Sequence, residues 1–158
     1  MSQIWPQDIE SSVLTRLKDN TYGIQAYLTI IDAARSQSTP TIADDCISDE
    51  RQDENPEVII DYESSDIEFY FGTDIEEQIR KNPSLTVTVI LNTSDRTNIK
   101  KFMSNYIEAI TKSLTGFSTG NITSIIPKND IIDDLYRDET DTTKIVGVRF
   151  ELLINGGI

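Results

Sequence analysis

The chain has 158 residues, of which 37% are hydrophobic and 26% are charged, and this composition is typical of one folded domain over residues 1–158 and excludes a disordered chain. It contains no histidine and one cysteine, Cys46, which excludes an intramolecular disulfide and indicates folding in a reducing compartment. The formal net charge is −13, and Lys and Arg do not cluster, so we expect no tight binding to nucleic acid.

The negative charge is concentrated in one segment. Residues 44–77 contain 14 acidic residues and one basic residue, whereas the rest of the chain contains 13 of each sign. The overlapping stretch 36–55 is rich in Ser, Thr, Pro, Asp and Glu, which predicts an acidic mobile loop or insertion. No apolar run exceeds three residues, and the first six residues resemble no signal, so we expect neither a membrane span nor export by a standard signal.

Helical patterns precede the acidic segment. Residues 6–19 begin with Pro6, which suits a first helical turn, and their apolar residues recur at helical spacing. Residues 21–35 combine a helical apolar pattern with the Tyr, Thr and Ile content of a strand, so their state stays open and a helix is favoured.

Strand patterns follow. Residues 58–71 fit either one long bent strand or two strands with a turn at 63–66. A short helix is predicted over 74–82, ended by Pro83. Residues 84–92 predict a central strand, whose core face would carry Leu85, Val87, Val89 and Leu91.

The strongest pattern is an amphipathic helix over about residues 95–114, which we expect to dock on a sheet. Its apolar stripe consists of Ile99, Phe102, Met103, Tyr106, Ile107, Ile110 and Leu114. Ser94 or Asp95 is predicted to cap the first turn, and Gly116 to end the helix in a left-handed conformation. Glu108 and Lys112 lie one turn apart, the spacing of a helical ion pair.

Two strands are predicted at the end of the chain, over residues 131–137 and 143–155, joined as a hairpin by a polar turn at 138–142. The core face of the second strand would carry Val146, Val148, Phe150, Leu152 and Ile154. All the elements together predict an α+β fold. In this fold a small antiparallel or mixed β-sheet carries the long helix on one face, and an N-terminal helix completes the domain.

No pattern predicts catalysis, and we expect no catalytic, cofactor-binding or metal site. The absence of histidine removes the commonest general base and metal ligand, and the acids around Cys46 would raise the pKa of its thiol. The acidic doublets are expected to face solvent; they are Asp44-Asp45, Glu76-Glu77 and Asp133-Asp134. Neither residues 44–57 nor the acids of the hairpin turn, Asp138, Glu139 and Asp141, fit a calcium loop, and no phosphate-binding glycine motif occurs.

The order of elements resembles that of phage tail terminator and head-to-tail joining proteins over residues 84–155, about half of the chain. The resemblance rests on LTVTVIL at 85–91, on the helix opened by DR at 95–96 and running through YIEAI at 106–110, and on the hairpin segments YRDE at 136–139 and VRFE at 148–151. It implies a helix laid on a small sheet and a structural protein of the tail or neck, made in the host cytoplasm. It also implies a homo-oligomeric ring around the DNA passage, expected to be a hexamer, that contacts tail-tube and neck or connector proteins and has no active site.

The acidic segment lies outside that family pattern, and its placement stays open. As the inner wall of a ring it would repel phosphates and let DNA pass, whereas charge runs more often face water outside. Two other functions also stay open. One is an acidic inhibitor that mimics DNA in a basic groove, and the other is an enzyme built on two convergent carboxylates with separated pKa values.

Overall fold

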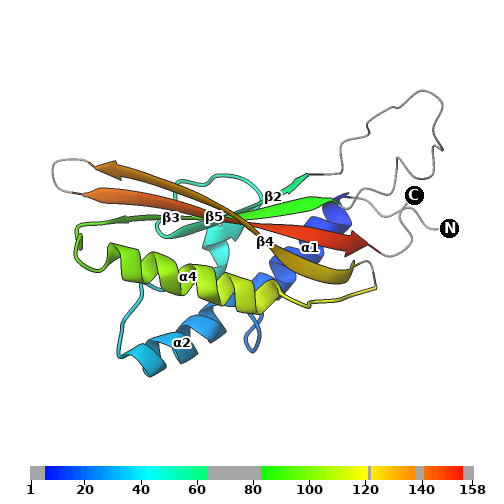
Figure 1. The fold of residues 1–158 in the computed structure, drawn as a ribbon, viewed down its shortest axis with the longest axis horizontal. Helices are drawn as coiled ribbons and strands as arrows, with labels where there is room; N and C mark the ends of the chain where they lie inside the picture. The colour runs from blue at the N-terminus through cyan, green and yellow to red at the C-terminus, as the bar shows by residue number, and fades with distance from the viewer. Residues whose placement is uncertain (1–5, 64–82, 121, 138–140, 155–158) are drawn as a thin grey trace.

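One mixed β-sheet carries α-helices on a single face (Figure 1). The computed structural model describes residues 6–63, 83–120, 122–137 and 141–154. Their elements, in chain order, are α1 (Pro6–Leu17), α2 (Ile24–Arg35), the 3-10 turn η1 (Asp44–Cys46), β1 (Ile47–Ser48), β2 (Glu57–Glu63), β3 (Ser84–Thr93), α4 (Ile99–Leu114), β4 (Ile122–Arg137) and β5 (Thr142–Ile154). The predicted α+β class, with the long helix packed on one face of the sheet, is confirmed.

The described strands lie in the order β1-β2-β3-β5-β4. Only β1 and β2 run parallel, and the other three neighbouring pairs are antiparallel. β3 is central, because Val87 lies opposite Ile60 of β2 on one side and opposite Val148 of β5 on the other. The two edges of the sheet are therefore the two-residue strand β1 and the 16-residue strand β4.

The core lies between the sheet and the helices. Both predicted core faces are confirmed where the structure describes their side chains: Leu85, Val87, Val89, Leu91, Val146, Val148, Phe150 and Leu152 are all buried. α4 packs its apolar stripe on β3 and β5, α1 packs on β1, β2 and α4, and α2 packs on α4. Figure 1 shows α2 on the side of α4 away from the sheet, so the helices form two layers.

α4 begins at Ile99, four residues later than expected. The carboxylate of Asp95 accepts hydrogen bonds from the backbone N–H (3.1 Å) and the side-chain amide (3.0 Å) of Asn98. Asp95 therefore caps the turn that precedes the helix, whereas Asn98, the N-cap of α4 itself, makes no side-chain cap. The predicted left-handed residue at the end of the helix is confirmed, since Gly116 has φ of 76° just beyond α4.

Residues 21–35, which the sequence left open, contain the helix α2. Its buried side chains, Ile24, Leu28 and Ile31, recur at helical spacing and meet α4, whereas a strand would turn alternate side chains away from that partner. α1 confirms the first predicted helix. The two helices join through a tight turn in which the carboxylate of Asp19 accepts hydrogen bonds from the backbone N–H of Thr21 (2.9 Å) and Tyr22 (2.7 Å).

The stretch 36–55 contains two regular elements that the sequence did not predict, η1 and β1. It also buries Thr39, Ile42 and Ile47. β1 depends on pairing with β2, a contact between distant parts of the sequence that no local pattern reports. The expected mobility of this stretch stays a prediction. The elements predicted over 64–82 and most of the hairpin turn lie outside the described residues.

β4 begins at Ile122, nine residues before the predicted start of the first hairpin strand. The register between β4 and β5 shifts between Pro127 and Ile131. Extra residues in one strand break the alternation of side chains, and for this reason the sequence pattern indicated only the second half of β4. The pairing of β4 with β5 confirms the predicted hairpin.

Candidate functional site

The residues singled out for chemistry do not converge in the described part of the chain. Cys46 is partly buried, and burial, followed by the charge of Glu54, raises the pKa of its thiol. Asp44 and Asp45 are exposed on η1. Among the described residues, no three His, Cys, Asp or Glu side chains are grouped so as to hold a metal ion.

Of the other candidate acids, some lie in the described residues and some lie outside them. Asp133 and Asp134 are neighbours in β4, opposite Val146 and Ile145 of β5. Asp141 is partly exposed at the end of the hairpin turn. Glu76, Glu77, Asp138 and Glu139 lie outside the described residues.

Residues 44–57, called here the acidic loop, are held by two anchoring side chains. The carboxylate of Glu57, 1% exposed, accepts hydrogen bonds from the backbone N–H of Gln52 (2.7 Å) and Glu54 (3.3 Å). The side chain of Asn55 makes two bonds with the backbone of Asn92 in β3, of 2.8 and 2.9 Å. The backbone of the loop is therefore attached to the sheet while most of its acids remain outside.

Six acids of the acidic loop are exposed, and they are Asp44, Asp45, Asp49, Glu50, Asp53 and Glu54. Its one basic residue, Arg51, lies 3.2 Å from a carboxylate oxygen of Asp53 and 3.8 Å from one of Glu57. A single cation shared in this way leaves the loop strongly negative, and exposed like charges on a held backbone create a field that attracts cationic partners.

The sheet face opposite the helices is the second surface of interest. Residues on it pair across β3 and β5 as Thr86 with Arg149 and Ile90 with Ile145. In the described part of the chain no helix lies over this face, as Figure 1 shows. Near its β4 edge, Ile126 is 44% exposed opposite Glu151, and no described strand pairs with the outer edge of β4.

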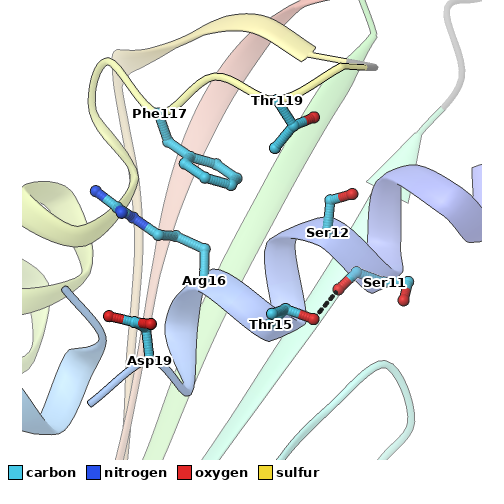
Figure 2. A pocket seen from close by; sticks show the side chains of 7 residues that line it. All are labelled: Ser11, Ser12, Thr15, Arg16, Asp19, Phe117 and Thr119. Atoms are coloured by element: carbon cyan, nitrogen blue, oxygen red, sulfur yellow. Dashed lines mark hydrogen bonds between the residues drawn. The ribbon is translucent and has the colours of Figure 1, made fainter. Parts of the chain in front are cut away.

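A hollow of about 300 Å³ lies between α1 and the segment that joins α4 to β4 (Figure 2). The residues that line it are Ser11, Ser12, Thr15, Arg16, Asp19, Phe117 and Thr119. We call it the Arg16 hollow, because Arg16 is the only basic residue among those lining residues. Its lining comes from segments about 100 residues apart in sequence, which explains why no local pattern indicated it.

Arg16 is fixed on three sides. Its Nε donates a 2.8 Å hydrogen bond to the carbonyl oxygen of Ser113, in the last turn of α4, where carbonyls have no partner within the helix. The guanidinium carbon lies 4.6 Å from the ring centroid of Tyr22 and 4.8 Å from that of Phe117, within cation–π range of both. Within the described chain, no group accepts a hydrogen bond from its two Nη atoms, so the fork of the guanidinium is available to a ligand.

Asp19 lines the hollow together with Arg16, but the two form no ion pair. One carboxylate oxygen of Asp19 accepts the two backbone hydrogen bonds of the turn before α2, and these bonds, followed by the weaker charge of Arg16, lower the pKa of Asp19. Figure 2 shows Asp19 and Phe117 on either side of the Arg16 side chain. The Arg16 hollow thus combines a positioned cation with a mainly hydroxyl-bearing wall.

A cluster of hydrogen-bonded polar side chains joins α2, α4 and the segment between α2 and η1. The side-chain amide of Asn105, 1% exposed, donates to Gln37 (2.8 Å) and Thr39 (2.9 Å) and accepts from Arg35 (2.5 Å). Arg35 also contacts Glu108, which lies 3.2 Å from Lys112, so the predicted helical ion pair is confirmed. The polar groups of Asn105 are all bonded, which assigns this cluster to the scaffold.

The sequence matches no known family model and no curated protein sequence. Among solved structures, a chain from the virion of a native gene transfer agent (GTA) particle is similar to this one, with 13% sequence identity and a TM-score of 0.41, over 70% of this chain and 79% of the other. A likeness of this degree assigns neither a family nor a role. In the described residues, no helix is long and apolar enough to cross a membrane.

Proposed function

We propose that this chain is a structural virion protein, a tail terminator or head-to-tail connector subunit, which assembles with identical copies into a ring around the DNA channel. A hexamer is the expected size, and tail-tube and neck or connector proteins are the expected neighbours. The observation that carries the proposal is the one-sided fold, in which the described helices cover one face of the sheet and leave the β4 edge, with the exposed Ile126 beside it, for contact.

The physical argument starts from β4. An edge strand of 16 residues presents a row of backbone donors and acceptors, which folded proteins usually cover or blunt. Pro127, which has no N–H, and the register shift after it blunt only the middle of this edge. The exposed Ile126 lies beside that shift, so the same region offers apolar surface to a neighbouring subunit.

The charge distribution supports a role around DNA without tight binding. Six exposed acids gather on the acidic loop, and a wall of this sign repels phosphates. A subunit of this kind acts through its surfaces and needs no catalytic group.

Size measurement of the purified protein tests the proposal. We expect light scattering coupled to gel filtration, and native mass spectrometry, to show one closed assembly of a fixed number of copies, and negative-stain images to show rings. Monomers alone, at every concentration and also after addition of purified tail-tube and neck proteins, would contradict it.

The exposed acids of the acidic loop also favour a second candidate, an inhibitor that occupies the DNA groove of a basic protein. Glu57 and Asn55 hold the loop backbone in place, so its carboxylates are presented without a large loss of conformational entropy on binding. Competition with DNA for a basic partner tests this function. Binding that survives conversion of the six exposed acids to Asn and Gln excludes it.

A further inference from the structure

We propose that the Arg16 hollow is a carboxylate-binding site, and that its ligand is an acidic side chain from the acidic loop of a second copy of this chain. The inference rests on the proposed function, because it names a contact between neighbouring subunits of the ring.

The hollow is preorganised for an anion. The bond to Ser113 and the rings of Tyr22 and Phe117 fix the Arg16 side chain before any ligand arrives. Little conformational entropy is therefore lost on binding, and the planar fork of the two Nη atoms matches the two oxygens of a carboxylate. Burial of the pair against the two rings would strengthen it relative to a solvent-exposed ion pair.

The hydroxyl groups of the wall divide into two kinds. Ser12 and Thr15 donate to the carbonyl oxygens of Asp8 and Ser11, both at 2.9 Å, so their protons are used within α1. The exposed Ser11 side chain has no acceptor in the described chain, and Figure 2 shows it at the end of the hollow away from the Arg16 guanidinium. Arg16 is therefore the group that would hold the anion.

The acidic loop of another copy is the occupant that charge complementarity favours. The loop has six exposed acids and one internal cation, Arg51, which already contacts Asp53 and Glu57. A chain with net charge −13 repels polyphosphates, whereas a single carboxylate on a complementary surface can approach one fixed arginine.

The two patches are distinct surfaces of the chain. The acidic loop surrounds β1, whereas the hollow lies between α1, which packs on β1 and β2, and the segment of Phe117 and Thr119 that leads into β4. A ring of identical subunits joins two different patches at each contact. Phe117 and Thr119 of the hollow lead into β4, the edge strand that the proposed function assigns to subunit contact.

Charge reversal tests the contact. Arg16→Glu is expected to raise the concentration needed for half-assembly at least tenfold, and so are loop variants in which one acidic pair, at positions 44 and 45, 49 and 50, or 53 and 54, is replaced by lysine. The decisive step is to mix Arg16→Glu with each loop variant. In an alternating ring of even number, the hollow of each Arg16→Glu subunit then faces lysines, and the unchanged Arg16 of each loop variant faces the unchanged acids. Assembly therefore returns for the pair that fills the hollow.

Two further variants separate binding from folding. Ser11→Glu adds a negative charge at the exposed edge of the hollow, leaves the contacts of Arg16 with Ser113, Tyr22 and Phe117 in place, and is expected to weaken assembly by repelling the incoming carboxylate. Lys100→Glu is the matched control for Arg16→Glu, because it makes the same change of charge at an exposed position of α4 and should assemble like the unchanged protein. Circular dichroism and thermal unfolding report whether each variant is folded.

The outcomes are distinct. If the unchanged protein never assembles, the proposed function fails. If it assembles, and Ser11→Glu and the folded Arg16→Glu protein do so equally well, the carboxylate site is wrong while the ring stands. If the variants fail separately and no mixture restores assembly, the acidic loop is not the occupant.

Discussion

The hydroxyl of Tyr106 donates a 2.7 Å hydrogen bond to the carbonyl oxygen of Pro40, which attaches the centre of α4 to the segment after α2. Tyr106 is fully buried, and burial, followed by the charge of Asp32, raises the pKa of its phenol above the ordinary value. This bond is one of the links that hold the start of the stretch 36–55 against the helices.

Replacement of Tyr106 by Phe should lower the free energy of unfolding by about 1 kcal/mol at pH 7, because the Pro40 carbonyl loses its donor. The loss should shrink at alkaline pH. With a raised pKa in the fold, the neutral phenol stabilises the native state below pH about 10, and this contribution falls by about 1.4 kcal/mol per pH unit above that value. Urea unfolding of both proteins from pH 8 to 11 measures the difference, and a constant difference would contradict the assignment.

Gly23 is expected to tolerate no side chain. A Cβ there would lie 2.4 Å from the carbonyl oxygen of Asp19 and 2.5 Å from that of Leu17, both backbone atoms that cannot move aside cheaply. Gly23→Ala should therefore lower the free energy of unfolding by about 1–3 kcal/mol. Gly120→Ala is the control, since a Cβ at that position meets nothing within 4 Å. Equal denaturation midpoints for the two variants would show that α1 and α2 do not pack as described.

Glu10 on α1 should destabilise the protein at neutral pH. Burial, followed by the charge of Asp49 and contact with it, raises the pKa of Glu10. Stabilisation by the protonated form is then complete below pH about 4 and is lost as the pH rises through the raised folded pKa. Glu10→Gln should gain on the order of 0.5 kcal/mol at pH 7, a value discounted for partial exposure, and nothing at pH 3.5.

Thermal unfolding at the two pH values measures the effect at Glu10. Asp8→Asn is the matched control on the same helix. It removes an exposed acid from the first turn, where the helix dipole favours negative charge, so a small loss of stability is expected instead of a gain. A gain of the same size for both variants would indicate general charge repulsion and not a specific contact with Asp49.

Ile126→Lys should weaken self-association without harming the fold. The side chain is 44% exposed on the uncovered sheet face, so its replacement should change stability by less than about 0.5 kcal/mol, whereas a lysine buried between subunits would be costly. Ile30→Lys, at a 61% exposed position of α2, makes the same chemical change on the helical side. Sedimentation velocity should show smaller species for the first variant only, and equal behaviour of the two would remove the sheet face from the assembly.

The sequence reports those elements whose apolar residues recur with a regular period. α4 and β3 are of this kind, although α4 also packs on α2 and β3 also buries Thr86 and Ile90 on its other face. The state of α2 was ambiguous because Tyr, Thr and Ile suit a strand as well as a helix, and only its packing on α4 decides between them.

The candidate surfaces were less accessible to prediction. The excess of acids was evident from the sequence, but their anchoring by Glu57 and Asn55 depends on the fold. Arg16 gave no signal, since its partners Ser113 and Phe117 are distant in sequence and an arginine on the polar side of an amphipathic helix is ordinary. The sequence predicted a protein that acts through its surfaces, whereas the geometry was needed to define the candidate surfaces.

The unequal edges of the described sheet limit how copies of the chain can assemble through their strands. β1 pairs over two residues only and is flanked by the acidic loop, whereas β4 is long. A fibre of the cross-β type needs each chain to offer a full strand on both sides, and this chain offers it on one. Copies can therefore gather at high concentration without the described strands stacking one upon another into insoluble filaments.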